Sequence, residues 1–160
     1  KVDENYESVG EVVDEIISTF ASEAEERGIH LSGSMKVTHR NILCDGTKIR
    51  EIYVNLVSNA IKYTPRGGNV TITVEELPCE KEGYIKIKAE IKDTGIGMSK
   101  EYLPTLFEPF SRERNTTTGR VRGTCLGMPI VKKMVDLMGG SLEVESELGK
   151  GSRFVMRLKA

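Results

Sequence analysis

Hydrophobic residues recur at helical spacing near the start of the chain, at Val9, Val12, Val13, Ile16, Ile17, Phe20 and Ala24. Ser8 precedes this run, and Glu11 comes three residues after Ser8. This is the capping-box pattern of a helix start. Gly28 is a typical residue to follow the end of a helix. The pattern therefore predicts a helix from about Val9 to Arg27.

A second helical pattern, from Glu51 to Thr64, carries a polar stripe on an otherwise hydrophobic surface. Glu51, Asn55, Asn59 and Lys62 fall within a sector of ~80°, and hydrophobic residues fill most of the remainder. A helix this apolar is expected to be largely buried. Asparagine is a poor helix former, so two asparagines one turn apart either line a polar cavity that binds something or face bulk solvent.

Alternating patterns predict strands around these helices. Short strands are expected at 29–35 and 42–44, a β-hairpin at 70–74 and 85–91 with its loop at 78–83, and two closing strands at 142–144 and 154–158. The second helix should end near Pro65, and a third is expected at 128–138. Residues 93–127 are predicted to form a long loop with one short helix near Glu101. This order of elements implies an α+β fold with helices on one face of a largely antiparallel sheet.

Composition narrows the class of protein without identifying it. The chain has 160 residues, 38% hydrophobic and 29% charged, which suits one globular domain with a proper core. A net charge of -1 gives no global field for nucleic acid or an acidic membrane, so any anion binding must be local. Three cysteines without metal-like spacing favour reduced thiols and a cytoplasmic location, and no apolar run approaches the ~18 residues of a membrane span. The start at Lys1 suggests a fragment of a longer protein.

A candidate ligand-binding loop runs from Asp93 to Gly97, at the end of a predicted strand. The Asp93 carboxylate can accept a hydrogen bond from an exocyclic amine, and Gly95 and Gly97 allow the backbone to approach a flat ligand. The same letters also suit an ordinary turn. An aspartic protease would need two such loops, and the chain has one.

A glycine-rich stretch, Gly123 to Gly127, opens the third predicted helix. Glycines before a helix N-terminus expose amide groups, and the helix dipole favours an anion there. Four arginines lie just upstream and either contact phosphates or form a solvated basic loop, namely Arg112, Arg114, Arg120 and Arg122. The stretch is not a Walker loop, because the lysine and hydroxyl residue that should follow the last glycine are absent.

Five motifs in order give the chain a resemblance to a known family. They read NLVSNAIKYT, DTGIGM, LFEPF, GTCLGMPIVK and GKGSRF, and they resemble the catalytic ATP-binding domain of sensor histidine kinases, within the gyrase, chaperone, histidine kinase and MutL (GHKL) superfamily. The resemblance covers essentially the whole chain. It implies the Bergerat fold, a two-layer sandwich in which a mixed five-stranded sheet is packed on one face by three helices.

The resemblance also implies roles for residues of the second helix and the aspartate loop. Asn59 would bind Mg2+ through its side-chain oxygen, with Asn55 beside it, which suits a hard cation that retains several waters. Asn55 and Lys62 would be catalytic residues that also bind the nucleotide, Lys62 at the phosphates. Tyr63 would lie at the nucleotide edge. Asp93 would accept a hydrogen bond from the adenine N6 amine.

The remaining roles implied by the resemblance concern the pocket wall and a mobile lid. Gly95 and Gly97 would shape the adenine pocket, and the lid would span roughly Ser111 to Leu126. The phosphates would be wrapped by Gly123, Thr124, Leu126 and Gly127. Phe107 and Phe110 are expected to anchor the base of the lid by core packing rather than to touch ATP.

Two positions depart from the patterns of related proteins. Superfamily members that hydrolyse ATP place a glutamate base where this chain has Asn55. An asparagine cannot take a proton from water, so the site is expected to hold ATP for transfer. Cys125 replaces a glycine of the phosphate loop. If this position needs a positive φ, a side chain there costs on the order of 1 kcal/mol, which predicts weaker or lid-disordered nucleotide binding.

The resemblance implies that residues 1–160 form one catalytic domain that donates the γ-phosphate of ATP to a histidine. His30 and His39 match no phosphoacceptor pattern, so that histidine is expected on a dimerisation and histidine-phosphotransfer hairpin domain upstream in the same parent protein. The response regulator would be an indirect partner, and we expect no nucleic acid and no direct membrane contact. The alternatives are another GHKL ATPase or serine-type protein kinase, or a degenerate interaction module that no longer handles nucleotide.

Overall fold

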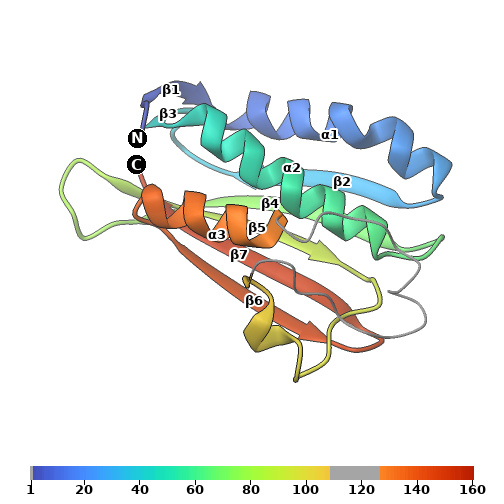
Figure 1. Cartoon of the computed structure of the whole chain (residues 1–160). Coiled ribbons are helices and arrows are strands. Elements are labelled where there is room, and N and C mark those ends of the chain that lie inside the picture. The colour runs from blue at the N-terminus through green and yellow to red at the C-terminus, as the bar shows by residue number, and fades with distance from the viewer. Residues whose placement is uncertain (1, 109–126) are drawn as a thin grey trace.

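Three helices cover one face of a five-stranded sheet in this computed structural model, which describes residues 2–108 and 127–160 (Figure 1). The strand order is β2-β4-β5-β7-β6, where β2 pairs with β4 in parallel and every other neighbouring pair is antiparallel. The strands are β2 (His30–Lys36), β4 (Asn69–Pro78), β5 (Ile85–Asp93), β6 (Ser141–Glu147) and β7 (Gly151–Lys159). The predicted α+β class and its mixed five-stranded sheet are confirmed.

Helix α1 (Val9–Glu26) begins and ends where its sequence signals place it. The Ser8 side chain accepts a hydrogen bond from the Glu11 amide at 3.3 Å, so the predicted cap is present. Gly28 has a φ of 67°, the left-handed conformation that ends many helices. The Arg66 guanidinium donates to the Glu26 carbonyl at 2.8 Å and satisfies one of the free carbonyls of the last turn.

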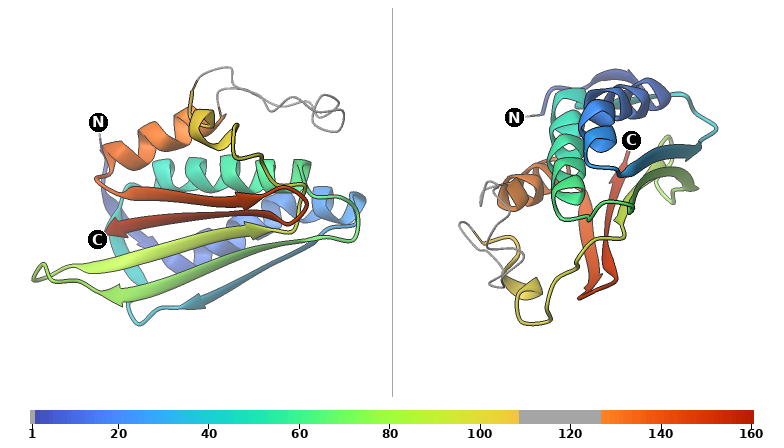
Figure 2. Two further views of the ribbon diagram at one scale, coloured as in Figure 1. Left: turned by 90° about the horizontal axis from the view of Figure 1, so that it is seen from below. Right: turned by 90° about the vertical axis from the view of Figure 1, so that its right-hand side faces the viewer.

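Helix α2 (Gly46–Lys62) lies between α1 and α3 (Gly127–Leu137) and packs its apolar face on the sheet (Figure 2). Its N-cap is Asp45, whose carboxylate accepts from the Lys48 amide at 3.2 Å. The core joins fully or almost fully buried residues of this helix to equally buried residues of the sheet. The helix residues are Ile52, Leu56, Val57 and Ile61, and the strand residues are Val70, Ile72, Val74 and Ile91. This packing fixes which side of α2 remains available for polar side chains.

Two short strands, β1 (Asn5–Ser8) and β3 (Asn41–Cys44), form a separate antiparallel sheet near the N-terminus. Strand β3 was predicted and β1 was not. Arg50 of α2 ties β1 to the helices, because it pairs with Glu7 at 3.0 Å and with Glu15 of α1 at 2.7 Å. The short helix predicted near Glu101 is a 3-10 turn at Leu103–Thr105.

The face of the sheet opposite the helices carries cross-strand ion pairs. Arg153 of β7 pairs with Glu90 of β5 and Glu145 of β6. Val155, two residues along the same face, is only 1% exposed and lies between Glu90 and Glu143 of the neighbouring strands. The ion pairs of Arg153 therefore make this part of the face polar.

Candidate functional site

The polar stripe of α2 reaches the edge of the helix layer in its last two turns. The Asn55 side-chain nitrogen donates to the Glu51 carbonyl at 2.8 Å. A backbone carbonyl can only accept, so the amide nitrogen must face the helix and the side-chain oxygen is left to face outward. Asn55 therefore presents an acceptor and not a base to anything bound beside it.

Asn59 and Lys62 follow on the same stripe, and both are half-buried. Neither side chain makes a hydrogen bond or ion pair within residues 2–108 and 127–160. Tyr63 ends the helix by donating its amide to the Asn59 carbonyl at 3.1 Å. Its own carbonyl accepts from the Ile96 amide at 3.0 Å, so the end of α2 and the aspartate loop are held side by side.

Asp93 is the last residue of β5 and is only 7% exposed. One carboxylate oxygen, Oδ1, accepts from the Gly95 amide at 2.8 Å and from the Ser152 amide at 3.2 Å. The other oxygen, Oδ2, has no protein partner in the described part of the chain. Burial raises the pKa of Asp93, although the two amide hydrogen bonds work in the opposite direction. A buried, fixed carboxylate with one oxygen left over is what recognition of an amine donor requires.

Gly95 and Gly97 are required by close backbone approach. A Cβ on Gly95 would overlap the Tyr63 carbonyl, and one on Gly97 would overlap the Glu147 carbonyl. Gly97 also has a φ of 71°, a conformation that side chains disfavour. The aspartate loop is therefore enclosed between the end of α2 and the turn that joins β6 to β7.

That β6–β7 turn supports the aspartate loop in a way that the sequence reasoning missed. The Ser146 hydroxyl accepts from the Met98 amide at 2.8 Å, and the Gly149 amide donates to the Ile96 carbonyl at 2.8 Å. A Cβ on Gly151 would overlap the Asp93 carbonyl. The GKGSRF motif was recognised without a role, and its glycines were the signal that backbone must approach closely there.

Several predicted site residues lie outside the described residues, namely Gly123, Thr124, Leu126, Cys125, Phe110, the arginines at 112, 114, 120 and 122, and the lid as a whole. Gly127 is buried as the first residue of α3. Phe107 is half-buried and packs against the hydrophobic core, as predicted. The structure thus brings together the α2 stripe, the aspartate loop and the β6–β7 turn.

The side chains available here suit a nucleotide with a hard cation. Within the described ranges, no three His, Cys, Asp or Glu residues cluster closely enough to hold a metal ion by themselves. The free amide oxygen of Asn59 suits a cation that brings most of its oxygen ligands as phosphates and water. In the same described part of the chain, no helix has the length and apolarity needed to span a membrane.

Comparison with known proteins gives concordant matches. The family model described as histidine kinase-, DNA gyrase B-, and HSP90-like ATPase matches residues 44–160. The chain is 41% identical over 120 residues to hybrid signal transduction histidine kinase A of Dictyostelium discoideum, a match covering 72% of the chain and 6% of that protein. It is 33% identical over 159 residues to the autoinducer 2 sensor kinase/phosphatase LuxQ of Vibrio cholerae, covering 99% of the chain and 18% of that protein.

A solved structure gives the same fold. The catalytic domain of histidine kinase ThkA superposes with a TM-score of 0.78 at 23% identity, over 98% of this chain and 95% of that one. ThkA has also been solved in complex with response regulator protein TrrA, with a TM-score of 0.76 at 22% identity, over 99% of this chain and 42% of that one. The chain spans less than a fifth of the length of the two sequence relatives.

Proposed function

We propose a function from the premise that the chain belongs to the family of histidine kinase-, DNA gyrase B- and HSP90-like ATPases, as the ATP-binding catalytic domain of a sensor histidine kinase. In this proposal it binds ATP with Mg2+ and presents the γ-phosphate to a histidine on a separate domain. Bound ATP supplies the phosphoryl group, and Mg2+ neutralises charge on its phosphates.

Asp93 is the observation that carries the proposal. Its buried Oδ2 atom has no protein partner in the described residues, while Oδ1 is fixed by the amides of Gly95 and Ser152. A buried acceptor left without a partner costs free energy, and an exocyclic amine supplies the missing hydrogen bond. Asp93 would thus select adenine, and Gly95 and Gly97 would let the flat base lie against backbone.

The α2 stripe would hold the phosphate end of the nucleotide. Asn59 would coordinate Mg2+ through its free side-chain oxygen, and Lys62 would contact a phosphate. Tyr63 would flank the nucleotide between these residues and the aspartate loop. The phosphates would also be enclosed by the residues of the glycine-rich stretch, Gly123, Thr124, Leu126 and Gly127.

Asn55 would direct the site toward transfer and away from hydrolysis. Its side-chain nitrogen is held by the Glu51 carbonyl, so its oxygen can accept a hydrogen bond or coordinate a cation. An amide oxygen is too weak a base to take a proton from water. Phosphoryl transfer depends mainly on positioning and charge neutralisation, so an acceptor held in line would react without a strong base in this domain.

The acceptor histidine would belong to a dimerisation and histidine-phosphotransfer domain in the parent protein, upstream of this domain. A response regulator would receive the phosphoryl group afterwards. The sequence relatives are much longer than this chain, and ThkA has been solved in complex with a response regulator, both of which support these partners.

The test is to mix this domain with a folded hairpin domain from a related kinase, ATP and Mg2+, and to measure acid-labile, base-stable phosphohistidine. We expect labelling that disappears when the acceptor histidine is replaced and that falls with Asp93→Asn when ATP is limiting. No labelling with any folded hairpin would overturn the proposal. Hydrolysis or serine phosphorylation without a hairpin would favour another ATPase or kinase, and absence of heat on titration with an ATP analogue would favour an interaction module.

A further inference from the structure

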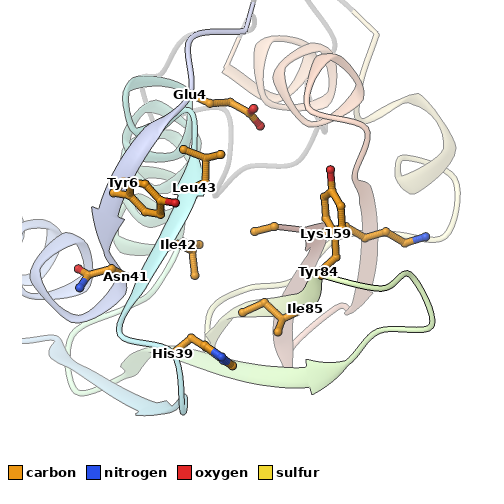
Figure 3. Close-up of a pocket in the computed structure, with 11 residues that line it drawn as sticks. Glu4, Tyr6, His39, Asn41, Ile42, Leu43, Tyr84, Ile85 and Lys159 are labelled. Carbon is orange, nitrogen blue, oxygen red and sulfur yellow. The ribbon is translucent and has the colours of Figure 1, made fainter.

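A groove of about 560 Å³ is lined by the residues labelled in Figure 3 and lies away from the proposed nucleotide site. It runs between β3 on one side and the start of β5 with the end of β7 on the other, and a second hollow of about 350 Å³ shares several of its lining residues. Ile85 lines the groove at the first residue of β5, whereas Asp93 is the last residue of that strand. Eight steps along a strand separate the two sites by roughly 27 Å.

The wall formed by β3 is an open strand edge. In the register of β1 and β3, Val9 would face Arg40, and the Val9 amide donates to the Arg40 carbonyl at 2.9 Å. Hydrogen-bonded and non-bonded pairs alternate along an antiparallel ladder, so Ile42 bonds to β1 while Asn41 and Leu43 do not. The backbone groups of Asn41 and Leu43 therefore point away from β1, and both residues line the groove.

Within the described ranges, the outward amide and carbonyl groups of Asn41 and Leu43 have no hydrogen-bond partner. Such a row of donors and acceptors is a template for another strand. Proteins that use a sheet edge in this way bind an extended peptide through its main chain, and neighbouring pockets select its side chains.

Three large side chains around this edge expose apolar surface. Tyr6 is 76% exposed, Tyr84 is 43% exposed and Leu43 is 41% exposed, and all three line the groove. Tyrosine is enriched at protein interfaces because its ring gives a large contact area and its hydroxyl remains hydrated. An occupant with apolar side chains on one face would cover these three residues.

Charged side chains of both signs lie at the groove. Lys159 lies 3.3 Å from Glu80, which also pairs with Lys86 at 3.2 Å, so Lys159 is only partly neutralised. Glu4 lines both the groove and the second hollow, and its carboxylate has no ion-pair partner in the part of the chain that the structure describes. A basic side chain of the occupant is therefore favoured beside Glu4.

We propose that this groove binds an extended, basic peptide segment of a partner protein by strand addition to β3. The main chain of the segment pairs with Asn41 and Leu43, its apolar side chains cover Tyr6 and Tyr84, and a lysine or arginine meets Glu4. The site is separate from nucleotide binding and does not depend on the function proposed above.

The probe is an acetylated, amidated peptide of alternating valine and threonine with a lysine at each end, titrated into the 160-residue chain and followed by amide NMR. We expect the Asn41 and Leu43 amides to become protected from hydrogen exchange. Leu43→Pro removes an outward donor of this edge strand, and loss of one hydrogen bond should weaken binding about fivefold. Leu43→Ala is the matched control, because it trims the side chain and keeps the amide.

A peptide with N-methylated valines tests main-chain pairing without altering the protein, so the proposal stays testable if Leu43→Pro fails to fold. It should bind at least fivefold more weakly, and Glu4→Lys should also weaken binding of the basic probe. Equal binding of the methylated and unmethylated peptides would overturn strand addition. So would concentration-dependent protection of Leu43 without peptide, which would instead assign the edge to a second copy of the chain.

Discussion

Replacement of Asp93 by asparagine changes one atom that faces the proposed base. The side chain keeps its shape, and its remaining oxygen can still accept from the Gly95 and Ser152 amides. The outward Oδ2 acceptor becomes an NH2 donor. A donor opposite the adenine N6 amine cannot bond to it, whereas a donor opposite the oxygen of a 6-oxopurine can.

The magnitude follows from the burial of this group. A hydrogen bond to a charged, buried acceptor contributes about 2 kcal/mol, so Asp93→Asn should weaken ATP binding by roughly thirtyfold. Because burial raises the folded-state pKa of Asp93, this carboxyl makes the unliganded protein less stable as pH rises through that pKa. Asparagine lacks this penalty, so the free energy of unfolding at neutral pH should stay unchanged or increase.

The assay is calorimetric titration of wild type and Asp93→Asn with non-hydrolysable analogues of ATP and ITP. Wild type should prefer the adenine analogue, and the variant should lose or reverse that preference. Asp136→Asn is the control, because Asp136 is an exposed residue of α3 that pairs with Lys132. Unchanged ATP affinity in a stable Asp93→Asn protein would refute the assignment of the adenine site.

Four further outcomes are expected. Asn59→Ala should reduce the gain in ATP affinity that Mg2+ gives by about tenfold in calorimetry, without weakening Mg2+-free binding. Gly97→Ala should lower the free energy of unfolding by about 2 kcal/mol or more in urea denaturation, because the position combines a positive φ with backbone overlap. Gly83 has a φ of 82° but open space around it, so the control Gly83→Ala should lower the free energy of unfolding by only about 1 kcal/mol. The pKa of Asp45 is lowered to about 2, first by the Asp3 amide, so its stabilisation of about 2 kcal/mol should be present above pH 4 and lost as pH falls toward 2. Asp45→Asn should flatten that pH dependence in acid denaturation. Cys125→Gly should strengthen binding of an ATP analogue, and equal affinity of the two proteins would show that Cys125 does not weaken binding.

The sequence predicted the elements whose signals are local. The polar stripe of α2 was visible as asparagines within a helical hydrophobic pattern, and the strand that ends at Asp93 was visible as alternating hydrophobic residues followed by a carboxylate. Strand β1 was missed because its four residues are mostly polar and exposed, and because Arg50 and pairing with β3 hold it in place. Such contacts join distant residues and leave no periodic pattern.

Apart from the glycines of the GKGSRF motif, the supports of the site left no signal in the sequence. Ser146 acts on the aspartate loop through a hydrogen bond to the Met98 amide, 48 residues away along the chain. The groove is built from segments near both ends and the middle of the chain, and its open edge depends on which residues of β3 bond to β1. A shift of one residue in that register would turn the free amides toward β1.

The two ends of helix α2 lie at the two proposed sites. Its N-cap, Asp45, lines the hollow beside the groove, and its last turns carry Asn59 and Lys62. The 17 residues of this helix span about 25 Å, so one element reaches from the hollow beside the groove to the residues of the polar stripe. Helix α2 therefore connects the proposed peptide edge with the proposed nucleotide pocket. Any effect of peptide on ATP affinity must be matched by an equal effect of ATP on peptide affinity.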